Sequence, residues 1–196
     1  MPRLDAQSTL LADAQPPPVI LVDENDRAIG LAGKLAAHAD GSLHRAVSVF
    51  AFDGSGSLLI QRRAMGKYHS GGLWSNSACT HPRVGEEPAD AARRCLLEEM
   101  GVTCESLEYA CAFVYRAQVS PTLIEHEYDH VFVARVRERP APNADEVEEW
   151  RAVSLLDVER ELGEDSARFS AWFPLALARL RPLAVTARVA ERLPRL

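Results

Sequence analysis

The most informative segment of this chain reads Ser75-Asn76-Ser77-Ala78-Cys79-Thr80-His81-Pro82, between a Gly-Gly pair and a stretch rich in Arg and Glu. A thiol and an imidazole two positions apart on an extended segment point to the same face of that segment. Such a face combines a proton donor or nucleophile with a metal ligand or base. A Cys-x-His pair alone is weak evidence, because a free cysteine is most often a small buried apolar residue. Evidence from the rest of the chain is therefore needed to decide whether this pair is functional or structural.

Apolar runs separated by turn residues predict strands on both sides of this segment. The run that ends at residue 52 is followed by Asp53-Gly54-Ser55-Gly56, which predicts a hairpin into the next strand. The expected strands cover residues 19–22, 46–52, 57–63, 73–78, 107–119, 129–137 and 150–153.

Helix signals lie between and after these strands. Pro88 suits a first helical turn and Gly101 suits a helix end, so we expect a helix over residues 88–100. Ser154 is a candidate cap for a short helix after the last strand. Closing helices are expected over residues 170–180 and 185–193.

The order of these elements predicts the fold class. Helices interspersed with hairpin-connected strands favour an α/β fold, in which a mixed β-sheet is flanked by helices in a single compact domain. That domain is expected over residues 19–180. Residues 1–18 end in three prolines and are expected to form an extended N-terminal lead-in, and residues 181–196 a C-terminal tail.

Composition excludes several classes of protein. The 196 residues carry a formal net charge of −6 without a long block of like charge, so nucleic acid is not an expected partner. Neither a signal-peptide pattern nor about eighteen consecutive apolar residues occur, which predicts no membrane segment and a cytoplasmic location. No C-x-x-C pair or secreted-scaffold spacing occurs, so reduced thiols are expected at Cys79, Cys95, Cys104 and Cys111.

Imidazoles and carboxylates suited to a divalent cation are spread along the chain. Glu125 and Glu127 are two residues apart, so on a strand both carboxylates face one way. His38 and His44 bracket a turn-forming stretch that can bring two imidazoles together. With His81, these donors suit a five- or six-coordinate Mg²⁺, Mn²⁺ or Zn²⁺. Spacing alone leaves an alternative open, in which the two glutamates are a solvated strand face and His38 is a surface residue.

Acidic residues flank the helix expected over residues 88–100. Glu98 and Glu99 lie at its C-terminal end, where the helix dipole opposes them, and Glu86 and Glu87 lie near its start. Acidic clusters of this kind often hold Mg²⁺, which in turn holds a diphosphate. The alternative is an ordinary amphipathic surface helix whose inward residues are Ala91, Cys95 and Leu96.

Basic residues before the Cys-containing segment are candidates for phosphate binding. Arginine can bind phosphate oxygens through two hydrogen bonds, and lysine binds them as a point charge. The alternative is that these side chains only extend from strand ends into solvent. The candidates are Arg62, Arg63, Lys67 and Lys34.

Together these residues resemble the type I isopentenyl-diphosphate isomerases, a family within the Nudix superfamily. The resemblance covers roughly residues 19–180. Its most specific part is Trp74-x-Asn76-Ser77-x-Cys79-x-His81-Pro82 followed later by Glu125-x-Glu127. It also includes Lys34-x3-His38, His44, Arg62-Arg63, Lys67, Gly72, Tyr115 and Phe169-Ser170-x-Trp172.

The resemblance implies a reaction and a role for each of these residues. The expected enzyme interconverts isopentenyl diphosphate and dimethylallyl diphosphate in isoprenoid biosynthesis, so its expected partner is a small prenyl diphosphate. Cys79 and Glu127 would lie on opposite sides of the isoprenoid and carry the proton transfers. Tyr115 would assist beside Glu127, and Trp172 would face the carbocation. The implied diphosphate ligands are Lys34, Arg63 and Lys67. The implied cation ligands are Glu99 for a diphosphate-bound Mg²⁺, and His38, His44, His81, Glu125 and Glu127 for a second ion, Mn²⁺, Mg²⁺ or Zn²⁺.

This chemistry has physical requirements of its own. Moving a double bond from the terminal to the internal position adds a proton to one carbon and removes another two bonds away, through a tertiary carbocation that water would quench. The site therefore needs a dry pocket, an acid and a base on opposing groups, and an aromatic face, over which a desolvated cation gains about 1–2 kcal/mol. A thiol with an ordinary pKa of about 8.5 can donate or accept a proton near neutral pH.

Two positions depart from the Nudix pattern. A hydrolase of this superfamily opens its motif with Gly and follows Arg with a metal-binding Glu, where this chain has Thr80 and Cys95. The loss of that Glu argues against hydrolysis of nucleoside diphosphates. Many of the isomerases carry Arg at the position of Cys95, so substrate binding here could be weakened or redirected.

Three alternatives to an isomerase stay open on sequence grounds. Cys95 and the C-terminal tail suggest a lyase or cyclase acting on a longer prenyl diphosphate. A Nudix hydrolase would release phosphate from nucleotides, and a binding protein with a degenerate site would only hold a diphosphate. Both a monomer and a homodimer are compatible with the sequence.

Overall fold

The computed structural model describes residues 16–180, which are built around strand β3 (His44–Phe52). This strand is antiparallel to β1, β4 and β6 and parallel to β8, so the nine-stranded sheet of the described residues is mixed. All but one of its residues are buried, as expected for a central strand whose sheet is covered on both faces. The other strands are β1 (Val19–Val22), β2 (Ala28–Ala32), β4 (Leu58–Arg63), β5 (Trp74–Ser75), β6 (Ala78–Thr80), β7 (Ser106–Ser120), β8 (Leu123–Arg135) and β9 (Val147–Val153).

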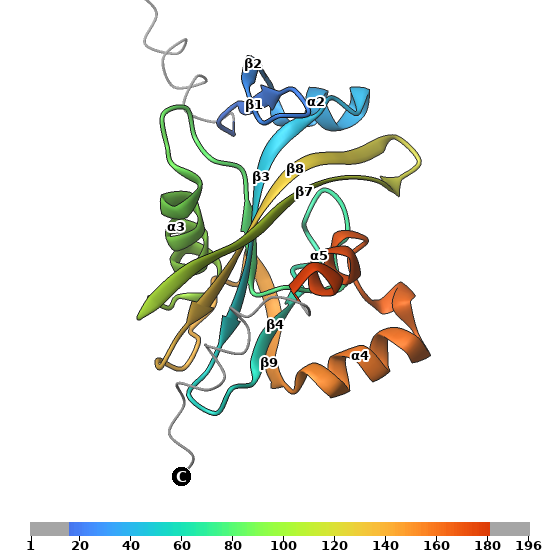
Figure 1. The fold of residues 1–196 in the computed structure, drawn as a ribbon. Helices are drawn as coiled ribbons and strands as arrows, with labels where there is room; N and C mark the ends of the chain where they lie inside the picture. The colour runs from blue at the N-terminus through green and yellow to red at the C-terminus, as the bar shows by residue number, and fades with distance from the viewer. Residues whose placement is uncertain (1–15, 181–196) are drawn as a thin grey trace, which may run out of the picture.

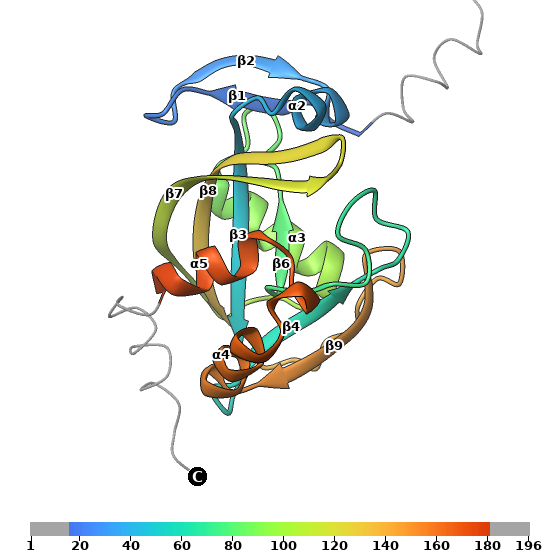
Figure 2. The same cartoon turned by 90° about the vertical axis from the view of Figure 1, so that its right-hand side faces the viewer.

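Helices lie on both sides of this sheet. Helix α3 covers one face, whereas α4 and α5 lie on the other, as the two perpendicular views show (Figures 1 and 2). The predicted mixed sheet flanked by helices in a single compact domain is thereby confirmed. The helices are α2 (Lys34–Asp40), α3 (Pro88–Met100), α4 (Leu155–Glu164) and α5 (Trp172–Leu180), with a 3₁₀ turn at Ser166–Arg168.

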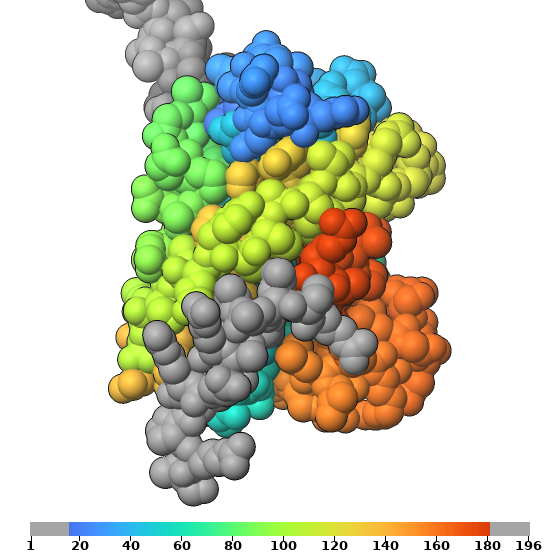
Figure 3. Space-filling model, viewed as in Figure 1, coloured from blue at the N-terminus to red at the C-terminus, as the bar shows by residue number. Residues whose placement is uncertain are grey.

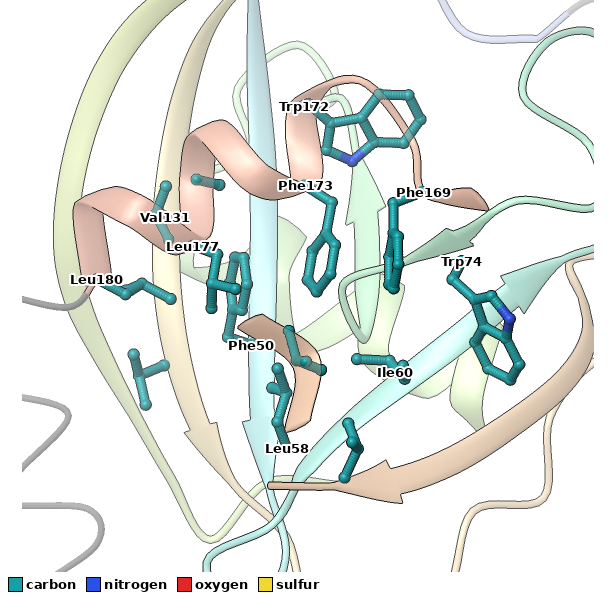
Figure 4. Packing of buried hydrophobic residues seen from close by; sticks show 14 of the residues in the cluster. Phe50, Leu58, Ile60, Trp74, Val131, Phe169, Trp172, Phe173, Leu177 and Leu180 are labelled. Atoms are coloured by element: carbon teal, nitrogen blue, oxygen red, sulfur yellow. The ribbon is translucent and has the colours of Figure 1, made fainter. Parts of the chain in front are cut away.

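Two apolar clusters fill the space between the sheet and its helices. Alternate residues of β3 point to opposite faces. Val47 and Val49 therefore pack with Leu96 of α3, and Phe50 packs with Phe173 of α5. Figure 4 shows the second cluster, in which the rings of Phe169 and Phe173 are nearly parallel, with an angle of 18° between them.

Helix α3 begins and ends at the predicted residues. Pro88 occupies the first turn, and Gly101 ends the helix with φ of 66°. A Cβ atom at position 101 would lie 2.2 Å from the carbonyl oxygen of Ala141, so both the backbone conformation and the space require glycine.

Strand β7 and helix α5 pack against each other on the outside of the second cluster. In the space-filling view they lie side by side across the face of the molecule (Figure 3). This contact covers the side of the sheet on which Trp172 lies, and Trp172 is only 3% exposed.

Several predictions about the elements were incomplete. Strand β2 and helix α2 were not expected, and His38 lies on α2. The single strand predicted over residues 73–78 is two short strands, and β9 begins at Val147 rather than at 150. Strand β8 begins at Leu123, not at 129, because its first half buries carboxylates and so gives no apolar signal. The predicted N-terminal lead-in lies almost entirely outside the described residues, as do the C-terminal tail and the helix expected over 185–193. Among residues 16–180, no helix is both long and apolar enough to cross a membrane.

Candidate active site

The five predicted cation ligands come together at one point of the sheet. His44 is the first residue of β3 and pairs with Glu127 on the parallel strand β8. Glu125, two residues before Glu127, lies on the same face of β8. His38 arrives from α2, and His81 directly follows β6. One ligand atom from each of the five residues lies within 4.8 Å of all the others.

Backbone carbonyls orient two of the imidazoles. Nδ1 of His38 lies 2.6 Å from the carbonyl oxygen of Lys34, and Nδ1 of His44 lies 2.8 Å from that of Ser42. A carbonyl oxygen can only accept, so Nδ1 carries the proton in each ring and Nε2 keeps its lone pair. The local geometry of α2 and of the turn before β3 therefore aims two metal-binding nitrogens at the cluster.

The unsatisfied atoms of the cluster fit a cation. Oε2 of Glu125 is buried without a hydrogen-bond donor among residues 16–180, and it lies 3.3 Å from Nε2 of His38, which in the neutral ring is also an acceptor. Burial lowers the pKa of His81 to about 3, so its imidazole is neutral and able to bind a metal near neutral pH. Lone pairs of buried oxygen and nitrogen that face one another are best satisfied by a divalent ion such as Mg²⁺, Mn²⁺ or Zn²⁺.

The predicted proton-transfer residues line the same cavity as this cluster. Tyr115 on β7 donates its hydroxyl proton to Oε2 of Glu127 over 2.6 Å, and the other oxygen of Glu127 lies 3.1 Å from Nε2 of His81. Burial, followed by the charge of Glu99, raises the pKa of Cys79 to about 12. Cys79 is therefore a thiol near neutral pH, which makes it an acid rather than a base in the resting site.

The cavity is small in this structure. Its volume is about 40 Å³. It is lined by Lys34, Ala46, Val47, Ser48, Arg63, Lys67, Tyr68, His69, Cys79, Thr80, His81, Tyr115, Glu125, Glu127 and Trp172.

Trp172 forms an aromatic wall of the cavity, and a hydrogen bond holds its indole in place. Its Nε1–H donates to Oδ1 of Asn76 over 3.0 Å, and the indole lies at the edge of the apolar cluster (Figure 4). Ser75 and Ser170 link the same two segments through their hydroxyl groups, 2.8 Å apart. The guanidinium of Arg63 lies 5.2 Å from the ring centroid, so the indole already faces one cation.

Three of the four predicted phosphate-binding residues reach the cavity. Nε of Arg63 is buried and has no acceptor among the described residues, and Nζ of Lys34 lies 5.0 Å from the centroid of the Tyr68 ring. Lys67 forms an ion pair with Glu146. Arg62 does not line the cavity, because the side chains of strand β4 alternate in direction and its guanidinium pairs with Glu148 and Glu149.

The acidic residues of α3 separate into two groups. Glu99 is buried and accepts hydrogen bonds from Gln61 over 2.7 Å and from the backbone N–H of Cys79 over 3.2 Å. Burial raises the pKa of Glu99 to about 7. Glu86 and Glu98 both bind Arg94 instead, with oxygen–nitrogen distances of 2.7 and 2.9 Å. Only Glu99 therefore approaches the segment that carries Cys79.

Position 95 does not face the cavity. Cys95 is 1% exposed within the cluster between α3 and the sheet, and its thiol lies 3.3 Å from the carbonyl oxygen of Ala92. Its side chain therefore cannot enlarge or redirect the cavity by direct contact, which removes one of the two arguments for a longer prenyl substrate.

Sequence reasoning missed two cavity residues on the loop between β4 and β5. Nε2 of His69 lies 2.7 Å from Oε1 of Glu125, and the hydroxyl oxygen of Tyr68 lies 3.0 Å from Nε2 of His38. Asn76 was recognised only as part of a motif, without its contact to Trp172. A loop residue has no periodicity that predicts where its side chain points, so only the Lys67 that precedes them marked this loop.

Comparisons with known proteins identify the family to which this chain belongs. A family profile described as the NUDIX domain matches residues 42–173. Isopentenyl-diphosphate Delta-isomerase 2 of Aromatoleum aromaticum is 53% identical over 162 residues, which is 83% of this chain and 85% of the relative. The isopentenyl-diphosphate Delta-isomerase of Burkholderia multivorans is 47% identical over 82% of this chain and 91% of the relative.

Solved structures share the fold at low sequence identity. A protein of Deinococcus radiodurans superimposes with a TM-score of 0.65 and 23% identity, covering 84% of this chain and 98% of the other. A MutT protein of Methanosarcina mazei gives a TM-score of 0.58 and 19% identity, covering 71% of this chain and 94% of the other.

Proposed function

This chain is a member of the Nudix family, and we propose that it is an isopentenyl-diphosphate Delta-isomerase, which interconverts isopentenyl and dimethylallyl diphosphate. One observation carries the proposal: the half-buried thiol of Cys79, a Tyr115–Glu127 pair and the indole of Trp172 line a single cavity. That set supplies the acid, the base and the cation-facing ring that this isomerisation needs. We assign the reaction to the cytoplasm and to isoprenoid biosynthesis.

Two proton transfers account for the reaction. The thiol of Cys79 gives its proton to the terminal carbon of isopentenyl diphosphate, and the electrons of the double bond form the new C–H bond. The positive charge then rests on the tertiary carbon. Glu127 removes a proton from the carbon nearer the diphosphate, and the electrons of that C–H bond form the internal double bond. Tyr115, which donates to Glu127 at 2.6 Å, holds the carboxylate in place for this step.

The surroundings protect the carbocation between these steps. Trp172 is 3% exposed and presents its ring to the cavity, where a desolvated cation gains about 1–2 kcal/mol from the indole face. The hydrogen bond from Trp172 to Asn76 fixes the plane of the indole. Water is kept away because the five-carbon tail enters a cavity walled by buried side chains.

Charged groups at the cavity anchor the diphosphate end. Lys34, Arg63 and Lys67 are the proposed ligands, and Arg63 offers a buried Nε–H that has no acceptor within the described residues. Binding energy from the diphosphate positions a small apolar tail that has few contacts of its own. Glu99 is the proposed ligand of a diphosphate-bound Mg²⁺.

The second cation belongs to the cluster of three histidines and two glutamates. When bound, Mg²⁺ or Mn²⁺ would supply positive charge that keeps the carboxylates of the cluster ionised. His38, His44, His81, Glu125 and Glu127 would hold it. Glu127 thereby links the cation to the proton-transfer site.

Solvent isotope exchange tests the proposal directly. Purified protein is incubated with Mn²⁺, Mg²⁺ and isopentenyl diphosphate in deuterium oxide, and product is followed by NMR. We expect dimethylallyl diphosphate carrying deuterium, and a Cys79→Ala variant that has lost the activity. No deuterium in either prenyl diphosphate would exclude this function. Geranylgeranyl diphosphate in a parallel reaction tests the remaining argument for a longer substrate.

A further inference from the structure

His69 has no role in the reaction described above, yet it contacts a proposed metal ligand. Its Nε2 lies 2.7 Å from Oε1 of Glu125, and its side chain is 3% exposed. We propose that His69 is a positioning residue, which holds Glu125 in the orientation that binds the cation. This inference rests on the metal site of the proposed function.

The two oxygens of Glu125 have different surroundings. Oε1 accepts from His69, whereas Oε2 is buried, has no hydrogen-bond donor in the part of the chain that the structure describes, and faces Nε2 of His38 at 3.3 Å. One oxygen is thus held by the protein and the other is free to bind an ion. Such contacts behind a ligand fix its rotamer and its basicity, and losing one typically weakens metal affinity about 10–100-fold.

His69 is itself held in place by its neighbours. Nδ1 lies 3.1 Å from the hydroxyl of Ser70, which can donate to it and leave the proton on Nε2 for Glu125. The imidazole packs edge-on against Tyr68 and Trp172, with centroid distances of 4.3 and 5.9 Å. The ring therefore joins the metal ligand Glu125 to the aromatic wall of the cavity.

The loop backbone that presents His69 depends on glycine. A Cβ at position 71 would lie 2.7 Å from the carbonyl oxygen of Met65, and Gly72 has φ of 77°. The loop between β4 and β5 thus folds tightly back on itself, which places His69 against Glu125 although the two residues are far apart in sequence.

Binding of Mn²⁺ alone tests the proposal without the reaction. Protein stripped with a chelator is titrated with Mn²⁺ by calorimetry. We expect His69→Leu to weaken binding about 10–100-fold. His69→Gln should keep affinity near that of the unchanged protein, because the glutamine amide nitrogen reaches close to the place of Nε2. His69→Asn, whose amide ends one carbon short, should resemble His69→Leu with a smaller packing change.

A second histidine–carboxylate pair provides the matched control. Nε2 of His130 lies 3.0 Å from Oδ2 of Asp26, and His130 lies on the opposite face of β8 from Glu125 because side chains alternate along a strand. His130→Leu should leave Mn²⁺ affinity unchanged. An equal loss in His130→Leu and His69→Leu would overturn the proposal, since the effect would then be general to the fold.

The remaining outcomes separate this inference from the proposed function. Unchanged affinity in His69→Leu would overturn the inference while the isomerase assignment stands. If His69→Gln binds as weakly as His69→Leu, the N–H donor is not what matters and the inference also fails. If the metal affinity depends on His69 but the unchanged protein gives no isotope exchange, the inference stands and the isomerase assignment fails.

Discussion

Two pairs of glutamates in this molecule, both predicted as candidate cation ligands from the sequence, have opposite surroundings. Glu125 and Glu127 lie on β8, are 4% and 8% exposed, and face imidazole nitrogens. Glu86 and Glu98 flank or belong to α3, and both accept hydrogen bonds from Arg94. The first pair still has free lone pairs, whereas the second is neutralised by a guanidinium that never loses its proton.

The partner of a carboxylate therefore decides whether it can serve as a metal ligand. An imidazole that is neutral leaves room for a cation, because both groups offer lone pairs to it. An arginine supplies the positive charge itself and fills the same space with five fixed donors. In this chain Arg94 occupies the carboxylates of Glu86 and Glu98, whereas the residues that could hold a cation at the His/Glu cluster lie on the sheet, directly after β6 and on α2.

Replacing one carboxylate of each pair gives the largest expected contrast. We expect Glu127→Gln to reduce the isomerisation rate by about 10³-fold or more, because the amide neither accepts the substrate proton nor binds the cation as a carboxylate does. Glu98→Gln should stay close to the unchanged rate. Both rates are measured by deuterium exchange at saturating Mg²⁺ and Mn²⁺. A comparable loss of rate in Glu98→Gln would show that Glu98, despite its pairing with Arg94, takes part in catalysis.

The effect of metal removal on the stability of the fold should differ between variants of the two glutamate pairs. An ion that binds only the folded protein stabilises it by about 4 kcal/mol at a free concentration about 1,000 times its dissociation constant. Thermal unfolding with and without Mn²⁺ should show this increment for the unchanged protein and for Glu98→Gln. Glu125→Gln should lose most of it. If the increment survives in Glu125→Gln, the cation binds elsewhere.

Removing the arginine tests the helix pair on its own. Arg94→Met keeps the length of the side chain but leaves Glu86 and Glu98 without their shared partner, and it removes a donor to the carbonyl oxygen of His81, 3.3 Å away. We expect a loss of about 1–2 kcal/mol in the free energy of unfolding, measured with urea, because the contacts are charge-assisted but only partly buried. A loss within error would mean that the network has no structural role.

The same variant has a defined pH dependence. The hydrogen bond from Arg94 holds the pKa of Glu86 below its usual value of 4.5, although partial burial opposes this. A carboxyl group with a lowered folded-state pKa contributes stability fully above its unfolded pKa and loses it as pH falls through the folded value. The stability difference between unchanged protein and Arg94→Met should therefore shrink below pH 4.5. A difference that stays constant there would assign it to packing.

Elements with strong local signals could be predicted from the sequence. Helix α3 has Pro88 in its first turn and Gly101 after its end, and residues 46–52 of β3 are apolar except for Ser48. In contrast, α2 has seven residues and no side-chain cap, so its local signal is weak. Strand β2 is mostly exposed, contains Gly30 and is held by pairing with β1.

The site divides in the same way. Glu125 and Glu127 could be placed on one face because a strand repeats every two residues. The three histidines were candidates by residue type, and the resemblance assigned them to one ion with the two glutamates. His69 could not be found, because its contact with Glu125 depends on a loop path that only the folded backbone defines. The pairing of Glu86 with Arg94 was equally hidden: the sequence indicated an acidic cluster, and the structure places an arginine inside it.

The smallest expected effect concerns the exposed edge of the α3 network. Arg83 also contacts Glu98, over 3.3 Å, but the two side chains are 54% and 49% exposed. An ion pair so open to solvent contributes about 0–0.5 kcal/mol, and salt screens it. We expect Arg83→Gln to leave the free energy of unfolding in urea nearly unchanged. The small difference from the unchanged protein should not grow when salt is added. If Arg83→Gln destabilises the protein as much as Arg94→Met, then charge near Glu98, and not the buried geometry of Arg94, holds this end of α3.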